Sequence, residues 1–216
     1  MANEHPADEH LADPPWADED IAISQSLARL AETAPGDEVT LAWILEQLHE
    51  RGFGLFLLIL ALPCCIPFLY GVPQIVALPL AFVAAQIVVG RRVPWLPAGL
   101  GARRVQVASL KALSDRAGPW LHRIEALSSP RLSLLVRPPM DRVVGVALVL
   151  FSASILVPLP GTNTVPGFAV ALVSMGLLQR DGLLSGVGVI LGTAWIATLV
   201  LAGATLASVI AGWLGA

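Results

Sequence analysis

The chain has 216 residues, of which 56% are hydrophobic and 13% are charged, with a formal net charge of −3. An ordinary soluble domain has about 45–50% apolar and about 25% charged residues, so the composition argues against a typical soluble enzyme and favours a protein that lies in lipid. The charge is unevenly divided, because residues 1–50 carry twelve acidic side chains against Arg29 alone, whereas residues 91–142 hold ten of the thirteen Lys and Arg residues.

The first 35 residues are acidic and punctuated by proline, which predicts a largely disordered segment with one short helix. That helix is expected within "IAISQSLARLAETAPG" and ends where Pro35 and Gly36 interrupt it. The opening residues have neither the basic segment nor the apolar core of a secretory signal, so we expect the amino terminus to stay in the cytoplasm.

Residues 36–216 are predicted to form a single membrane domain, which begins with an amphipathic helix over 36–52. Its apolar face has the spacing of one side of a helix and consists of Leu41, Ile44, Leu45 and Leu48. The helix is too polar to cross a bilayer.

The first long apolar run, residues 53–90, contains no Asp, Glu, Lys, Arg or His. As one helix it would be about 57 Å long, roughly twice the hydrocarbon thickness of a bilayer. Prolines cluster near its middle, in "LPCCIPFLYGVPQ". We therefore expect two shorter helices, over 53–66 and 73–90, that fold back as a hairpin.

The second apolar run, residues 143–180, has the same pattern, with "VPLPGTNTVPG" in its middle. The two runs align at the segment ends and at the helix breakers, which indicates an internal duplication. The matched pairs are Arg51 with Arg142, Gly54 with Gly145, Leu57 with Leu148, Pro67 with Pro158, Pro73 with Pro166, and Gln86 with Gln179.

The basic stretch 91–142 separates the two runs and predicts amphipathic helices that lie in a headgroup layer. Apolar residues such as Leu110, Leu113 and Trp120 fall opposite Arg and Lys. The excess of positive charge places this stretch in the cytoplasm, and membrane proximity accounts for it without nucleic acid.

The apolar tail, residues 183–216, is uncharged and long enough for one helix or barely enough for two. Small residues spaced four apart, Gly188 and Gly192, permit close helix packing. Their partner is either the chain's own hairpins or a second copy in a homodimer.

The fold expected from these elements is an all-α, multi-pass membrane protein with five to six transmembrane or re-entrant helices. Two topologies remain open. If each run is a complete hairpin, Arg51, Arg91, Arg142 and Arg180 all face the cytoplasm. If a run instead crosses once as a broken helix, the two halves are inverted, as in many transporters.

The proline interruptions are the candidate functional site, because a broken helix leaves polar backbone groups that lipid cannot satisfy. They are either a ligand or transport site at membrane depth or ordinary turns outside the bilayer. The candidates at the interruptions are Pro67, Tyr70, Gly71, Pro73, Gln74, Pro158, Pro160, Gly161, Thr162, Asn163, Thr164 and Pro166.

Gln86 and Gln179 are further candidates, although a hydrogen bond between helices is the simpler interpretation. Arginines at the run edges are expected to contact anionic lipid headgroups or to guide an anionic ligand. These are Arg91, Arg92, Arg103, Arg104 and Arg180.

Catalysis finds little support in the sequence. The apolar runs contain no carboxylate or lysine as acid or base, and no phosphate loop or nucleophile elbow is present. The histidines have no metal-ligand spacing, and Cys64 and Cys65 are expected to be inert packing thiols. We expect no catalytic residue, metal or cofactor.

Four stretches together resemble the ExoD family of bacterial membrane proteins: "ERGFGLFLLILALPCCIPFLYGVP", "AAQIVVGRRVPWLP", "RPPMDRVVG" and "VPLPGTNTVPGFAVALVSMGLLQRDG". The resemblance covers roughly residues 35–215. It implies an integral inner-membrane protein linked to exopolysaccharide synthesis.

Two functions are expected from the resemblance and the repeated interruption. The first is export of polysaccharide by moving or holding a lipid-linked sugar intermediate, a lipid or an ion between the hairpins. The alternative is a non-transporting scaffold that organises the polysaccharide synthesis machinery.

Overall fold

The N-terminal part of the molecule combines short helices with a two-stranded sheet. The computed structural model describes residues 23–67, 69, 71–112, 114–116, 133–136, 139–157, 162–213 and 215. This part comprises α1 (Ile23–Glu32), β1 (Glu38–Thr40), α2 (Leu41–Leu48), α5 (Ala98–Gly101) and β2 (Arg104–Gln106), followed by helical residues 107–112 and 114–116.

The helix predicted over 36–52 is divided into three elements. Thr40 has extended backbone angles, and its hydroxyl oxygen accepts a hydrogen bond from the Trp43 amide at 3.2 Å, so α2 begins only after this cap. His49 has a φ of 49°, which ends α2 before α3 begins at Glu50. The preceding residues form β1, which pairs antiparallel with β2 and sets Val39 opposite Val105.

The predicted interfacial helices of the basic stretch also differ from the structure. Within 91–116 the chain forms α5, β2 and the helical residues 107–112 and 114–116, while 113, 117–132 and 137–138 lie outside the described residues. Val107 and Leu110 are buried with Leu30, Val39 and Ile44 in a small core of the N-terminal part. Val107 and Leu110 are therefore covered by protein.

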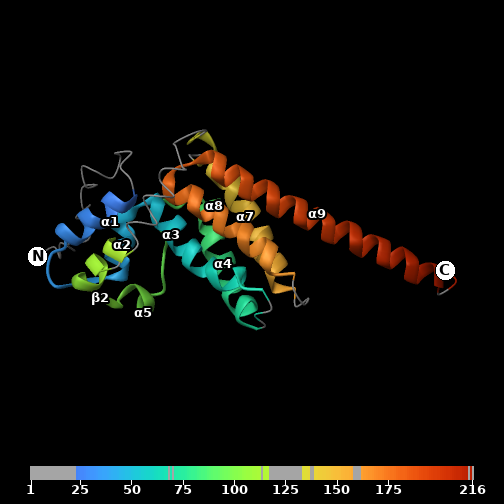
Figure 1. The fold of residues 1–216 in the computed structure, drawn as a ribbon, viewed down its shortest axis with the longest axis horizontal. Helices are drawn as coiled ribbons and strands as arrows, with labels where there is room; N and C mark the ends of the chain where they lie inside the picture. Colours follow the sequence, from blue (N-terminus) through green and yellow to red (C-terminus); the bar gives the residue numbers. More distant parts are fainter. Residues whose placement is uncertain are drawn as a thin grey trace, which may run out of the picture.

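The remainder of the described chain forms two helical hairpins and a long final helix (Figure 1). The first hairpin consists of α3 (Glu50–Ala61), the 3-10 helix η1 (Leu62–Cys65) and α4 (Val72–Val88). The second follows the 3-10 helix η2 (Ser133–Val136) and consists of α7 (Met140–Leu156) and α8 (Thr164–Gln179); α9 (Gly182–Trp213) ends the fold. These bounds agree with the predicted hairpin segments to within a few residues.

The hairpins cross-pack, because α3 lies along α8 and α4 lies along α7. Their shared core is apolar and includes Phe53, Leu57, Leu80, Leu148 and Phe151. Figure 1 shows that both hairpins point the same way. We call the end with Arg51, Gly90, Arg142 and Arg180 the base end, and the end with residues 66–71 and 157–163 the turn end.

Glycines let the cross-packed helices approach closely. A Cβ atom on Gly54 of α3 would lie 2.5 Å from the backbone nitrogen of Leu178 on α8. A Cβ on Gly145 of α7 would lie 3.0 Å from the backbone nitrogen of Val88 on α4. The predicted repeat partners Gly54 and Gly145 therefore occupy close-approach positions at the two helix pairs.

The tail forms one helix, α9, and not two. Its 32 residues correspond to a length of about 48 Å. Gly188 and Gly192 are buried against Val173 and Phe151, so this glycine pair packs on the chain's own hairpins. Beyond the bundle α9 stands alone, and nearly all of residues 197–213 are exposed (Figure 1).

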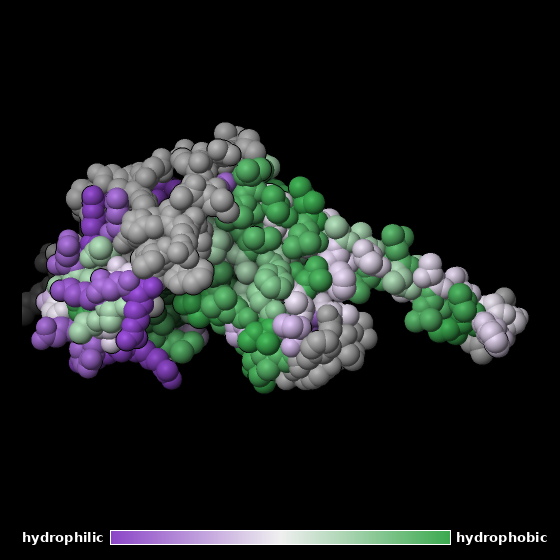
Figure 2. Space-filling view, viewed as in Figure 1, coloured by the Kyte–Doolittle hydropathy of each residue, from purple (hydrophilic) through white to green (hydrophobic). Residues whose placement is uncertain are grey.

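Hydropathy is segregated along the molecule. Figure 2 shows hydrophilic residues over the N-terminal part and hydrophobic residues over the hairpins. Large apolar side chains such as Ile75, Leu78, Leu150 and Ile190 are exposed on the bundle. Among the described residues, α9 has both the length and the hydropathy to cross a membrane, while α4 and α8 are shorter apolar helices.

Candidate functional site

The first interruption joins α3 to α4 through η1. Pro67 and Gly71 are exposed at the turn end, whereas Pro73, in the first turn of α4, is fully buried. Gly71 has a φ of 81°, a conformation that glycine adopts without strain. Gln74 is half-buried, and its Oε1 has no hydrogen-bond partner although no solvent reaches it. Tyr70 lies outside the described residues.

The second interruption joins α7 to α8. Pro158, Pro160 and Gly161 lie outside the described residues. Thr162 and Thr164 are half-buried, and Pro166 is fully buried in the first turn of α8.

Asn163 precedes α8 and is the buried polar residue of this interruption. It retains only 8% of its exposure, and its buried Oδ1 has no hydrogen-bond partner within the part of the chain that the structure describes. Asparagine at this position ordinarily accepts a hydrogen bond from the amide two or three residues on. Here the third residue is Pro166, which has no N–H, and the Asn163 side chain makes no capping hydrogen bond.

The two interruptions meet at the turn end. A Cβ on Gly167 of α8 would lie 2.7 Å from the backbone of Cys64 in η1, so these segments are in close contact. Cys64 also shares a buried cluster with Ala77 of α4 and Ile155 of α7. The structure thus brings residues of both predicted interruptions together on one side of the bundle.

Both cysteines are free thiols, and Cys64 is completely buried in this cluster. Its Sγ donates to the Leu60 carbonyl oxygen at 3.8 Å. Cys64 therefore packs as a small apolar side chain, in agreement with the sequence-based expectation.

The predicted glutamine pair lies at the base end, away from the interruptions. Gln86 is buried and holds the backbone of Trp95: its Nε2 donates to the carbonyl oxygen at 3.1 Å, and its Oε1 accepts from the amide at 2.6 Å. It anchors the loop after α4 and does not bond to another helix. Gln179 has a buried Oε1 without a partner.

The predicted headgroup-contacting arginines fall into two groups. Arg91, Arg92, Arg103 and Arg104 are exposed, and Arg104 Nη1 lies 3.3 Å from Glu38 Oε2 in a solvent-exposed ion pair. Arg180 is half-buried and ends α8 with a φ of 55°. The first four arginines therefore lie on the surface of the molecule.

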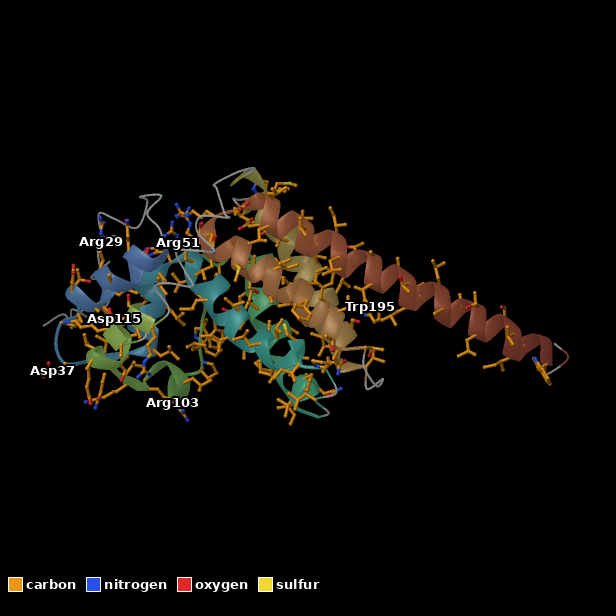
Figure 3. All side chains as sticks on the ribbon, viewed as in Figure 1. Arg29, Asp37, Arg51, Arg103, Asp115 and Trp195 are labelled. Carbon is orange, nitrogen blue, oxygen red and sulfur yellow. The ribbon has the colours of Figure 1, made fainter. Side chains whose placement is uncertain are left out.

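Sequence analysis missed several buried polar residues. Arg51 is buried, and its Nη1 donates to Ser26 Oγ at 3.0 Å (Figure 3). Asp181 is buried before α9, and its Oδ1 accepts from the amides of Leu183 at 2.9 Å and Leu184 at 3.2 Å. An Asp immediately before an apolar run is a recognisable helix-start signal that would have identified this cap.

Two further missed residues lie near the interruptions. Ser154 Oγ on α7 and Trp195 Nε1 on α9 are buried and have no hydrogen-bond partners among the residues described by the structure. Figure 3 shows Trp195 at the level where α7 and α8 approach their turn. A serine and a tryptophan within apolar helices give no sequence signal that separates them from ordinary packing residues.

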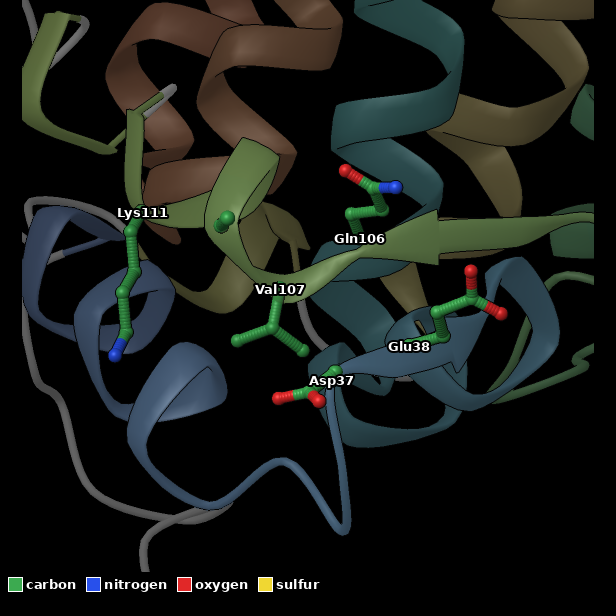
Figure 4. Close-up of a pocket in the computed structure, with 6 residues that line it drawn as sticks. Asp37, Glu38, Gln106, Val107 and Lys111 are labelled. Carbon is green, nitrogen blue, oxygen red and sulfur yellow. The ribbon is translucent and has the colours of Figure 1, made fainter.

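A separate hollow of about 340 Å³ lies at the sheet of the N-terminal part (Figure 4). It is lined by Asp37, Glu38, Gln106, Val107, Ala108 and Lys111. Its lining includes both acidic and basic side chains, and the Val107 amide donates a hydrogen bond to the Asp37 carbonyl oxygen at 2.9 Å. Among the described residues, no group of three His, Cys, Asp or Glu side chains is arranged to hold a metal ion.

Comparison with known proteins identifies similar chains. The family model described as exopolysaccharide synthesis, ExoD, matches residues 23–201. An uncharacterized protein of Synechocystis is 33% identical over 159 residues, which cover 72% of this chain and 74% of that protein. Protein ExoD of Rhizobium meliloti is 28% identical over 174 residues, which cover 78% of this chain and 72% of that protein. No solved structure gives a significant match.

Proposed function

Because the chain belongs to the ExoD family of exopolysaccharide synthesis proteins, we propose that it is a multi-pass inner-membrane protein that supports synthesis or export of exopolysaccharide. In this proposal it moves or holds a lipid-linked sugar intermediate, or a related lipid or ion, at the turn end of the two hairpins. The observation that carries the proposal is the buried Asn163 Oδ1 of the second interruption, which has no hydrogen-bond partner among the described residues.

Placement in the membrane is supported by the distribution of charge. The base end and the N-terminal part contain all the Asp, Glu, Lys and Arg of the described residues, because 52–90, 143–179 and 182–213 contain none. With both hairpins complete, the base end faces the cytoplasm and the turn end points into the bilayer. Exposed Arg91, Arg92, Arg103 and Arg104 then lie where anionic headgroups are met.

An internal duplication accounts for the cross-packing of the hairpins. Exchanging α3 with α7 and α4 with α8 turns the α3–α8 contact into the α4–α7 contact, which is the contact pattern expected of two duplicated halves. This arrangement supports a site shared by the two interruptions.

The proposal is tested with purified full-length protein in vesicles of phosphatidylethanolamine and phosphatidylglycerol. A fluorescent polyprenyl-linked sugar and fluorescent phospholipids are the probes, and loss of fluorescence to an impermeant quencher reports movement between leaflets. We expect faster movement than in protein-free vesicles and a decrease for Asn163→Ala and Gln74→Ala. Gln179→Ala is the matched control, since Gln179 also has an unpartnered amide oxygen but lies at the base end. Rates equal to those of protein-free vesicles for every probe would contradict the proposal.

The scaffold function is the second candidate, and the exposed distal half of α9 favours it. Val200, Leu206 and Ile210 are exposed there, and Gly203 and Gly212 would leave open space even with a Cβ. A homodimer or a partner of the polysaccharide machinery would meet this half, since Gly188 and Gly192 are already packed within the chain. Charge reversal at Arg103 and Arg104 should then reduce polysaccharide output more than Asn163→Ala does; the opposite ranking would favour the transport function.

A further inference from the structure

Several polar atoms at the turn end are buried and have no hydrogen-bond partner among the described residues. Burying such an atom without a partner costs free energy, so a cluster of them calls for an explanation. The atoms come from four helices: Oε1 of Gln74 on α4, Oγ of Ser154 on α7, Oδ1 of Asn163 before α8, and Nε1 of Trp195 on α9.

The register of α7 and α9 brings Ser154 and Trp195 to the same level. The ring of Phe151 on α7 packs on Gly192 of α9, and the two helices run in the same direction. Ser154 and Trp195 each follow these contact residues by three positions, which is one turn further along both helices. Figure 3 places Trp195 at this level.

Gln74 and Asn163 reach the same level from the other two helices. Gln74 lies one turn before Ala77, which shares a buried cluster with Ile155, the neighbour of Ser154. Asn163 lies one turn before Gly167, which contacts Cys64 of that cluster. The four polar groups therefore lie at a similar level of the bundle, at the turn end.

Internal structure does not account for these groups. Ser152 and Ser174, in the same helices, donate to the carbonyl oxygens of Leu148 and Val170 at 2.7 and 2.6 Å. Ser154 does not, and Asn163 has lost its usual capping partner to Pro166. A buried tryptophan N–H ordinarily finds an acceptor, yet Trp195 has none among the described residues.

The chemistry of the four groups selects a neutral, hydroxylated ligand. Two amide oxygens accept hydrogen bonds, the indole N–H donates, and the serine hydroxyl does either. A hydroxyl group of the ligand also donates and accepts, so it matches both kinds of partner and either orientation of the amides. No Lys or Arg is present in the apolar runs to bind a phosphate, and the indole N–H opposes a cation.

We propose that Gln74, Ser154, Asn163 and Trp195 form a binding site for the hydroxyl groups of a neutral sugar. This inference rests on the proposed function and adds to it the chemical class of the group that is bound. The phosphate of a lipid-linked sugar would then stay outside this site, while a sugar ring contacts it.

The experiment uses the full-length protein in nanodiscs and three probes that share one alkyl chain. Octyl glucoside carries neutral hydroxyls, octyl phosphate carries an anion, and octyltrimethylammonium carries a cation. Calorimetric titration, with empty nanodiscs subtracted, measures the binding of each. We expect saturable binding of octyl glucoside in preference to the other two.

Variants assign this binding to the four groups. Asn163→Leu, Trp195→Phe and Ser154→Ala each remove one partner and should weaken binding of octyl glucoside by roughly two- to tenfold. Gln179→Leu and Ser152→Ala are matched controls and should leave binding unchanged, because neither lies in the cluster. Ser154→Ala is a small substitution, so it still tests the site if Asn163→Leu or Trp195→Phe impairs folding.

Three outcomes would overturn the inference: equal binding of all three probes, preference for octyl phosphate, or undiminished binding by all three site variants. Failure of the proposed function is distinguishable. Sugar binding that depends on Asn163 without any lipid movement in vesicles would contradict transport but uphold this site. Lipid movement without preference for octyl glucoside would uphold transport and contradict this site.

Discussion

Buried polar groups at the base end and at the turn end of the hairpin bundle differ in their hydrogen bonding. At the base end Gln86 holds the Trp95 backbone, Arg51 donates to Ser26, and Asp181 caps α9. At the turn end Asn163 and Trp195 present polar atoms that bind nothing within the described chain. Two buried atoms at the base end, Gln179 Oε1 and Arg51 Nε, also have no hydrogen-bond partner within the described chain.

This difference teaches that burial alone does not identify a functional polar residue. A buried group whose partners lie within the chain stabilises the fold, whereas a buried group without partners lowers stability. The base end is therefore expected to determine stability, and the turn end is expected to determine binding. Substitutions at the two ends should move these properties separately.

The largest change in stability is expected for Gln86→Leu. The substitution leaves the amide and carbonyl of Trp95 without their partner, which costs about 2 kcal/mol. The thermal unfolding midpoint in detergent should fall by roughly 4–8 °C. Gln179→Leu is the control, and an equal fall in both variants would remove the distinction between partnered and unpartnered amides.

The next largest effect is expected for Asp181→Ala at the start of α9. Loss of the cap frees the Leu183 and Leu184 amides and costs about 1 kcal/mol. Asp181→Asn should retain most of the stability, since asparagine caps equally well. Chemical unfolding followed by circular dichroism checks both; identical losses would assign the effect to charge and not to capping.

At the turn end Asn163→Leu is expected to change stability in the opposite direction. It removes an unpartnered buried oxygen and should leave stability unchanged or raise it by up to about 1 kcal/mol. Thermal unfolding in detergent without sugar is the measurement. A clear loss would show that Asn163 belongs with the structural groups of the base end.

The smallest effect is expected for Arg104→Ala. Its ion pair with Glu38 is exposed, so its loss should cost less than about 0.5 kcal/mol. Binding to vesicles with anionic lipids should decrease more clearly than stability does, and binding to neutral vesicles is the control. Unchanged binding to anionic vesicles would separate Arg104 from the headgroup contacts.

Much of the bundle could be predicted because its signals are local. The runs without charged residues predicted the hairpins, and the prolines around Pro73 and Pro166 predicted where each hairpin turns. The pairing of β1 with β2 was not predicted, since strands of three residues separated by the whole first hairpin carry no local pattern. Gly188 and Gly192 were predicted to allow close helix packing, and they lie against Val173 and Phe151 of the hairpins.

The candidate site was predictable only in part for the same reason. Asn163 and Gln74 could be singled out because polar residues beside prolines are unusual in apolar runs. Gln86 is likewise a polar residue in an apolar run, but its hydrogen-bond partner is the backbone of Trp95 in the following loop. This partner could not be predicted without the folded loop. Trp195 and Ser154 could not be predicted as site residues, because their position depends on how α7 packs along α9. No local sequence pattern specifies that packing.

The unequal lengths of the helices have a consequence for the surrounding lipid. Helices α4, α7 and α8 have 16 or 17 residues, or about 24–26 Å, and α3 has 12, or about 18 Å, whereas α9 is about 48 Å long. A hydrocarbon core of about 30 Å is too thick for the former and too thin for the latter, so it would thin beside the turns while α9 tilts. Such a local depression would shorten the path of a polar headgroup across the bilayer at the place where Asn163 lies.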